Sequence, residues 1–378
     1  MIYLDSAATT LQKPPAVSQA VTRAMKCMAS PGRGGHRPAM LAAETAFACR
    51  LAAARFFHMD NPEQVVLTFN ATHGLNIAIK TLVRPGDTVL ISGYEHNAVT
   101  RPLAAIGGVT IRTARSPLFQ PEELLRSFAA QMTPEVSCVI CTHVSNVFGY
   151  ILPVEEIALL CRRRGVPFVL DASQSAGCLP VDMAELGAAF AAMPGHKGLY
   201  GPQGTGLLLC GGGAVRTLLE GGTGSASLQQ EMPEFLPDRL EAGTHNIPGA
   251  AGLLEGLRFV LRKGTGTILR HEQGLCARAA EGLARMDGVT VFAAPSPEGQ
   301  GGVLSFTAEG TDCEEVGQAL GRMGIAVRAG LHCAPLAHCT AGTLETGTVR
   351  VSFSAFNTPH EVDRFLCAVR SLFRLKRR

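Results

Sequence analysis

Several residue types are scarce in this sequence of 378 residues. It has no tryptophan and only four tyrosines, and charged side chains make up 17% against 46% hydrophobic ones. So few charges beside so many apolar residues exclude a disordered chain and a long coiled coil. The 42 glycines indicate many tight backbone sites rather than a fibrous repeat. A chain of this length is expected to form one large domain or two.

Long apolar runs are also missing. No uninterrupted apolar stretch approaches the roughly 18 residues of a membrane span, so we expect no membrane contact. The first ten residues lack the basic segment and apolar run of a secretory signal. The 12 cysteines are scattered rather than arranged as a compact disulfide framework. We therefore expect a cytoplasmic protein with reduced thiols.

The sequence has few clusters of like-charged residues. The formal net charge is +3, and the one basic cluster is residues 374–378. A short basic tail is typical of a solvated helix end, so we expect no nucleic-acid partner.

Short apolar runs alternate with longer helical patterns over most of the length. Strands are predicted at 64–69, 87–92, 136–142 and 166–170, and helices at 38–57, 72–81 and 154–164. This alternation predicts an α/β fold with a mainly parallel sheet covered by helices. In such sheets ligands bind at the carboxyl ends of the strands, which is where polar residues follow each predicted strand.

The pattern changes after about residue 258. Strands are predicted at 289–293, 302–307, 326–328 and 349–354, mixed with helices at 311–323 and 359–373. We expect a large domain over 15–258 and a smaller α+β domain formed by 1–14 with 259–378.

A lysine enclosed by glycines is the strongest local signal. Lys197 lies in the run Gly-His-Lys-Gly, which alone could be an exposed turn, although the glycines would let the backbone approach a ligand closely. Asp171 ends an apolar strand, where a buried carboxylate needs a cationic partner or donors. An enzyme that uses pyridoxal phosphate needs such an acid for the pyridine nitrogen and a lysine for the covalent link. Lys197 follows Asp171 by about one strand–helix–strand unit, so both could face one cofactor.

Nine ordered motifs resemble those of the cysteine desulfurase family, class V aminotransferases of pyridoxal-phosphate fold type I. They span nearly the whole chain: YLDSAATT, NATHGLN, EHNAV, HVSNVFG, DASQSAG, GHKGLYGP, EAGTHN, RAGLHCAP and VRVSFSAFNT. The resemblance implies a large domain with a mainly parallel sheet and a smaller C-terminal α+β domain. It also implies a homodimer with shared active sites.

The same resemblance assigns the cofactor site. Lys197 would carry the cofactor, Asp171 would pair with the pyridine nitrogen, and His96 would stack on the ring. The Gln174 amide would contact the ring hydroxyl. The phosphate would be bound by Ala71, Thr72 and His196. Thr244 would contact the phosphate of the cofactor in the neighbouring subunit. A helix opening at Thr72 would offer free N–H groups to that anion.

The substrate and nucleophile sites follow from the resemblance as well. Arg350 would clamp a carboxylate in bidentate fashion, and Asn146 would contact the cofactor or the substrate carboxylate. Cys333 lies in a loop similar to the persulfide-carrying loop of SufS-type desulfurases and would be the catalytic thiolate. Three positions depart from the family pattern: His73 replaces an acid, Pro194 replaces a phosphate-binding serine, and Gly198 is an extra residue after the lysine.

The expected reaction converts L-cysteine to L-alanine and leaves a persulfide on Cys333 for an acceptor protein or thiol. Selenocysteine lyase activity, or another β-lyase or transaminase reaction on the same scaffold, is the alternative. A third hypothesis is a cofactor-binding regulatory or scaffold protein without turnover. The intact set of lysine, aspartate, arginine and cysteine argues against it.

Other cysteines and histidines also lie close together in the sequence. Cys138 and Cys141 form a CxxC pair inside a predicted strand, where residues three apart point to opposite faces, so redox pairing is not expected. His332, Cys333, His338 and Cys339 offer four potential zinc ligands, but the family motif favours the nucleophile role and no metal. The run with Arg33, His36 and Arg37 would lie near the substrate entrance, without an assigned role.

Overall fold

The computed structural model describes residues 1–32 and 34–376. Its largest element is a seven-stranded sheet in the order β2-β8-β7-β6-β5-β3-β4. Strands β3 to β7 all run parallel to one another. Strand β8 is antiparallel to both of its neighbours, β7 and β2. The predicted mainly parallel sheet is therefore confirmed. The strands are β2 (Val65–Thr68), β3 (Thr88–Ser92), β4 (Thr110–Ala114), β5 (Val136–Thr142), β6 (Phe168–Asp171), β7 (Phe190–Pro194) and β8 (Gly206–Cys210).

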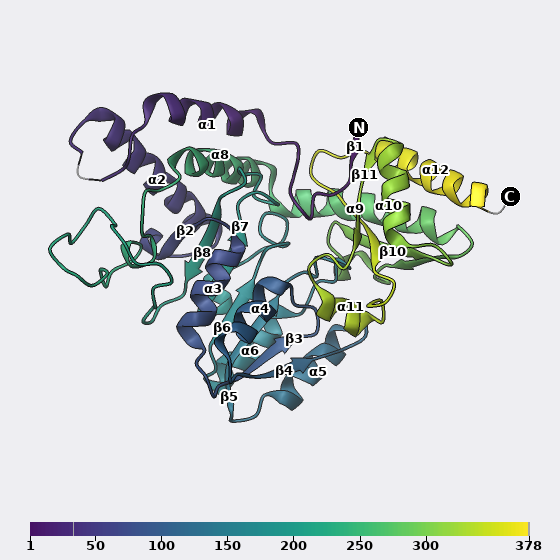
Figure 1. Ribbon diagram of the computed structural model, residues 1–378, viewed down its shortest axis with the longest axis horizontal. Coiled ribbons are helices and arrows are strands. Elements are labelled where there is room, and N and C mark those ends of the chain that lie inside the picture. Colours follow the sequence, from purple (N-terminus) through teal and green to yellow (C-terminus); the bar gives the residue numbers. More distant parts are fainter. Residues whose placement is uncertain (33, 377–378) are drawn as a thin grey trace.

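Helices cover both faces of this sheet, because successive strand residues alternate between two hydrophobic cores. In β5, Val139 and Cys141 pack in one core, whereas Cys138 and Ile140 pack in the other. The first core is closed by α2 (Arg37–Phe56), α5 (Pro121–Gln131), α6 (Val154–Arg164), α7 (Met183–Leu186) and α8 (Ile247–Lys263). The second is closed by α3 (Ala71–Leu82) and α4 (Asn97–Ile106). Helix α1 (Pro15–Cys27) lies along α8 (Figure 1).

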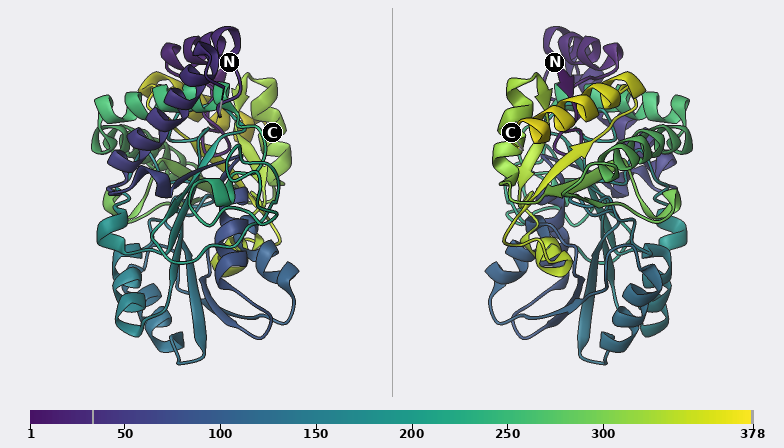
Figure 2. Two further views of the ribbon diagram at one scale, coloured as in Figure 1. Left: turned by 90° about the vertical axis from the view of Figure 1, so that its left-hand side faces the viewer. Right: turned by 90° about the vertical axis from the view of Figure 1, so that its right-hand side faces the viewer.

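The C-terminal part has a core of its own. An antiparallel sheet in the order β12-β13-β10-β9 packs against three helices. Its strands are β9 (Val289–Phe292), β10 (Val303–Ala308), β12 (Arg328–Gly330) and β13 (Thr348–Ser352). The helices are α9 (Thr265–Ala284), α10 (Cys313–Arg322) and α12 (Pro359–Lys376), which gather on one side of the molecule (Figures 1 and 2).

The chain start joins this C-terminal part. Strand β1 (Ile2–Tyr3) pairs in parallel with β11 (Ile325–Ala326), and Asp5 bridges to Ser352. The strand predicted at 326–328 is therefore two strands, since β11 pairs with β1 whereas β12 pairs with β13. The domain bounds expected from the sequence stay a prediction.

Helix α11 (Pro335–Ala341) follows the loop that contains Cys333. Across the described residues, no helix is long and apolar enough to cross a bilayer.

Candidate active site

Lys197 lies in the loop that connects β7 to β8, and its side chain is partly buried. The pKa of its amine falls from 10.5 to about 8, chiefly because of burial; Asp171 and Asp5 oppose the fall, and Arg350 and Arg328 add to it. A lowered pKa leaves part of the amine neutral near pH 7, which is the form that can act as a nucleophile.

The two glycines around the lysine have a structural reason that the sequence did not show. A Cβ at Gly195 would lie 2.2 Å from the Thr205 hydroxyl, and one at Gly198 would lie 2.4 Å from the Ala176 carbonyl oxygen. We expected these glycines to let the backbone approach a ligand. The structure shows that they let this loop pack directly on neighbouring protein segments, and the approach to a ligand stays a prediction.

Asp171 ends β6 and is 2% exposed. Its Oδ1 accepts hydrogen bonds from the backbone N–H and the hydroxyl of Ser173. His96 caps the N-terminus of α4, where its Nδ1 accepts from the Ala98 N–H at 2.9 Å. Burial lowers the pKa of His96, Asp171 opposes the shift, and Lys197 adds to it. The structure thus brings the predicted acid, lysine and stacking histidine into one interacting group.

Arg350 lies on β13 and is 2% exposed. One terminal nitrogen donates to the Asn146 carbonyl oxygen and the other to the Asp5 carboxylate, both at 2.8 Å. Among the described residues, its Nε and the Oδ1 of Asn146 are buried without a hydrogen-bond partner. Arg328 also approaches Asp5, at 3.6 Å. The two arginines and one aspartate leave an excess positive charge that suits a carboxylate ligand.

Cys333 is exposed, and its loop is tied to the residues just described. Its carbonyl accepts from the Asn97 N–H, and the preceding carbonyl, of His332, accepts from the Asn146 side chain, both at 2.8 Å. His332 and Cys333 both have left-handed backbones, with φ of 50° and 57°. Two consecutive non-glycine residues in that region are strained, and such strain gathers at functional sites. The Cys333 thiol also acts electrostatically on Arg350.

The other predicted cofactor residues lie on three further segments. Gln174 follows β6 and donates from its amide to the Ala7 carbonyl at 3.0 Å. Ala71 and Thr72 form the first turn of α3, and the Thr72 side chain is exposed. His196 precedes the lysine, and its Nδ1 lies 3.1 Å from the Thr9 hydroxyl.

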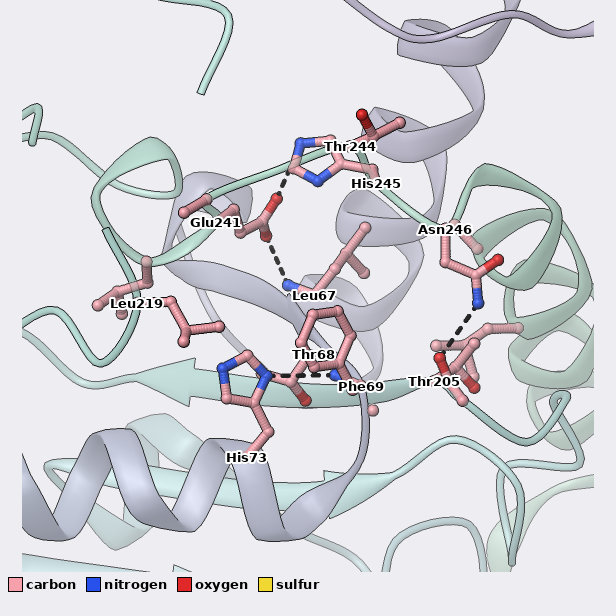
Figure 3. A pocket seen from close by; sticks show the side chains of 16 residues that line it. Leu67, Thr68, Phe69, His73, Thr205, Leu219, Glu241, Thr244, His245 and Asn246 are labelled. Atoms are coloured by element: carbon pink, nitrogen blue, oxygen red, sulfur yellow. Dashed lines mark hydrogen bonds and ion pairs between the residues drawn. The ribbon is translucent and has the colours of Figure 1, made fainter. Parts of the chain in front are cut away.

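Thr244 lies apart from this group, in the pocket of Figure 3. No other predicted site residue lines that pocket, which includes His73, Phe69 and Leu219. In the lining of this pocket, Glu241 accepts from the Leu67 N–H at 2.6 Å and lies 3.3 Å from His245. The phosphate role of Thr244 in a neighbouring subunit stays a prediction.

The structure also places most of the other residues considered in the sequence analysis. Cys138 and Cys141 lie on opposite faces of β5, as predicted, and burial raises the pKa of both thiols. His36 caps α2, with its Nδ1 3.4 Å from the Ala39 N–H, and Arg37 begins that helix. Arg33 lies outside the described residues. The His332 and His338 rings stack with centroids 5.6 Å apart.

Four residues of the site had no role in the sequence analysis: Asp5, Asn97, Ser173 and Arg328. They lie inside four motifs that the sequence analysis singled out, namely YLDSAATT, EHNAV, DASQSAG and RAGLHCAP. Position within such a motif is therefore the signal that could have drawn attention to them. Their partners could not be found this way, because Asp5 and Arg350 are 345 positions apart.

The chain is similar to known proteins over nearly its whole length. A model of the family "Aminotransferase class-V" matches residues 2–365. The chain is 36% identical over 98% of its length to a probable cysteine desulfurase of Mycolicibacterium paratuberculosis, and 34% identical over 98% to one of Xylella fastidiosa. Among solved structures, it is similar to a cysteine desulfurase of Thermococcus onnurineus, with a TM-score of 0.88 and 31% identity over 98% of this chain and 94% of that one.

The chain therefore belongs to the class-V aminotransferase family. Its fold also matches that of the Escherichia coli cysteine desulfurase CsdA, with a TM-score of 0.86, 26% identity, and coverage of 99% of this chain and 94% of that one. The chain spans 55% of the length of the M. paratuberculosis relative and 90% of the Xylella relative.

Proposed function

We propose that the chain is a pyridoxal-phosphate-dependent cysteine desulfurase that converts L-cysteine to L-alanine with a persulfide formed on Cys333. The observation that carries this proposal is the electrostatic network of four side chains, Arg350, Lys197, Asp171 and Cys333. Arg350 interacts with Lys197, Asn146 and the Cys333 thiol, and Lys197 interacts with Asp171. A carboxylate site, an amine, an acid and an accessible thiol thus lie within reach of one small amino acid.

The residues present fit pyridoxal phosphate. A partly buried lysine and a buried aspartate interact electrostatically, which suits the needs of its aldehyde and its pyridine nitrogen. In the first turn of α3 the Asn70 side chain accepts from the His73 N–H, and the N–H groups of Ala71 and Thr72 would bind its phosphate. Asn146 Oδ1 and Arg350 Nε, buried without partners in the described part of the chain, leave an acceptor and a donor for the ligand. When bound, the cofactor supplies an electron sink for a negative charge at the substrate Cα.

The residues of this chain then have separate tasks. Arg350 binds the substrate carboxylate, and the neutral Lys197 amine accepts the Cα proton and returns it to a neighbouring atom. The Cys333 thiolate attacks the sulfur of cysteine, so an S–S bond forms as the C–S bond breaks. The electron pair of that bond goes to the substrate carbon, which takes up a proton and becomes the methyl group of alanine.

The wider assignments belong to the same proposal. The protein is a homodimer in which Thr244 completes the phosphate site of the second subunit, and it works in the cytoplasm. The persulfide passes to an acceptor protein or thiol. The large domain covers 15–258, and residues 1–14 with 259–378 form the small domain. L-selenocysteine is the alternative substrate.

Replacement of the lysine tests the proposal. Lys197→Ala should lose both the visible absorption band of the bound cofactor and the release of alanine from L-cysteine. Lys26→Ala, on the exposed face of α1, should retain both. Normal alanine release by Lys197→Ala, or none by the cofactor-loaded wild type, would contradict the assignment. Parallel assays with L-selenocysteine decide between the two substrates.

A further inference from the structure

The carbonyl oxygen of His196 is surrounded by donors from the start of the chain. The Thr10 N–H lies at 3.1 Å, the Lys13 ammonium at 2.9 Å, the Thr10 hydroxyl at 3.1 Å and the Thr9 hydroxyl at 3.2 Å. These residues lie more than 180 positions from His196 in the sequence, yet they meet at the peptide that precedes Lys197.

The number of available hydrogens and lone pairs determines which donor binds which acceptor. A carbonyl oxygen has two lone pairs, and the Thr10 N–H and the Lys13 ammonium suffice to fill them. The Thr10 hydroxyl accepts from Lys13 at 2.5 Å and can donate to the Lys197 carbonyl at 3.2 Å. The single hydrogen of the Thr9 hydroxyl is then available for the Nδ1 of His196, at 3.1 Å.

A hydrogen bond accepted at Nδ1 determines the form of a neutral imidazole. The ring hydrogen must then reside on Nε2, which becomes a donor. The ring of His196 is neutral at ordinary pH, because burial together with the charges of Lys197 and Lys13 lowers its pKa to about 4. Lys13 itself is a partly buried cation that forms no ion pair in the described part of the chain. Burial lowers its pKa to about 8.

We propose that Thr9, Thr10 and Lys13 are positioning residues that hold the His196–Lys197 peptide and fix His196 as an Nε2–H donor for the phosphate group of the cofactor. Lys13 and Thr10 donate hydrogen bonds to the carbonyl oxygens of His196 and Lys197, and the Thr9 hydroxyl determines the tautomer of His196. This inference rests on the cofactor assignment of the proposed function.

Nitrogen NMR of the ligand-free protein tests the tautomer directly. With ¹⁵N-labelled histidine, the His196 signal, identified by its loss in His196→Gln, should show the Nε2–H tautomer. Thr9→Val keeps the size of the side chain but removes the hydroxyl, so the signal should shift toward a mixture of tautomers. Thr9→Ser should restore it, and Thr110→Val, on the exposed strand β4, should leave it unchanged.

A second variant keeps the test decisive if Thr9→Val folds poorly. Lys13→Met removes one donor from the His196 carbonyl, so the Thr9 hydroxyl should turn to that oxygen and the Nε2–H tautomer should lose population. A wild-type signal of the Nδ1–H form, or an unchanged Nε2–H signal in both variants, would overturn the proposal.

Cofactor affinity gives the independent readout. Loss of one hydrogen bond that orients a phosphate donor should weaken pyridoxal phosphate binding roughly tenfold in Thr9→Val, with recovery in Thr9→Ser. An unchanged dissociation constant would overturn the phosphate role of His196 orientation. A wild type that bound no pyridoxal phosphate would instead overturn the proposed function, whereas the tautomer measurement would still decide the role of Thr9.

Discussion

Lys197 and Arg350 are cations inside the protein, and the carboxylates near them are Asp171 and Asp5. Burial disfavours a charged amine, so the neutral form of Lys197 is more populated than that of a lysine in water. Arg350 keeps its charge because the guanidinium group does not lose its proton in proteins, although burial lowers its pKa. One site therefore holds a nucleophilic amine beside a permanent cation.

The lowered pKa of Lys197 predicts how the ligand-free protein reacts with pyridoxal phosphate. The pKa falls from 10.5 to about 8, so the reactive neutral fraction should rise between pH 7 and 9 and level off above that range. The rate at which the absorption band of the bound cofactor appears should follow a midpoint near pH 8. A rate that keeps rising to beyond pH 10 would show an amine that is not perturbed by burial.

The same shift affects stability, with a sign that follows from proton counts. Between pH 8 and 10.5, the unfolded chain binds a proton at Lys197 that the folded chain has released. The contribution of this residue to the free energy of unfolding therefore increases as the pH rises through that window.

Site residues could be predicted from the sequence where a motif contains them. Their contacts could not be predicted where the partner residue is distant in the sequence. Lys197, Asp171 and Cys333 were identified from their motifs, and in the structure Arg350 connects them electrostatically. The contacts of Thr9 and Lys13 could not be predicted, because hydrogen bonds between residues far apart in sequence depend on the folded backbone. The reason for Gly198 was missed because the oxygen it approaches, that of Ala176, lies on another loop.

At the scale of elements, the β7–β8 loop depends on close backbone packing. In Gly198→Ala, the new Cβ would lie 2.4 Å from the Ala176 oxygen, a backbone atom that cannot move freely. We expect a loss of more than about 2 kcal/mol of unfolding free energy, measured by denaturant titration. Gly274→Ala, in α9 where nothing lies within 4 Å, should be neutral or stabilising by up to about 1 kcal/mol. Equal effects of the two changes would contradict the packing argument.

A buried ion pair joins α2 to the segment before α8. Arg50 donates two hydrogen bonds to the Glu241 carboxylate, at 2.6 and 2.5 Å, and a third at 2.6 Å to the Val65 carbonyl. Arg50→Ala would leave a buried carboxylate without its cation, which should cost about 3–5 kcal/mol of unfolding free energy.

The exposed pair Arg278 and Asp363 is the matched control. Its side chains are 50% and 45% exposed, so Arg278→Ala should cost at most about 1 kcal/mol. Thermal and denaturant unfolding of both variants would measure the difference. A loss as small in Arg50→Ala as in the control would show that the buried pair adds little.

Three strands of the large sheet were not predicted. Strand β4 reads Thr-Ile-Arg-Thr-Ala and lies at the sheet edge, so it carries no buried signature. Strands β7 and β8 are short, with five residues each, and an apolar run such as that of β8 would indicate a buried strand but not its direction. By contrast, β5 was predicted with its exact bounds, since both of its faces are buried.

At the scale of the whole molecule, the site unites distant parts of the chain. Asp5, from the start of the chain, and Arg350, from β13, form an ion pair beside Asn146, which follows β5 of the large sheet. The Cys333 loop is held by residues that follow β3 and β5. Because the two sheets supply different groups, a change in how they pack should alter substrate contacts before it alters either core.

The most direct test of the account is the fate of sulfur in Cys333→Ser. The cofactor-loaded wild type treated with L-cysteine should release alanine and carry an added sulfur on the peptide with Cys333, as shown by mass spectrometry. Cys333→Ser should bind cofactor and cysteine but release almost no alanine, whereas Cys339→Ser, which removes another exposed thiol, should behave as the wild type. Alanine release at the normal rate from Cys333→Ser, or added sulfur only on Cys339, would contradict the persulfide role of Cys333.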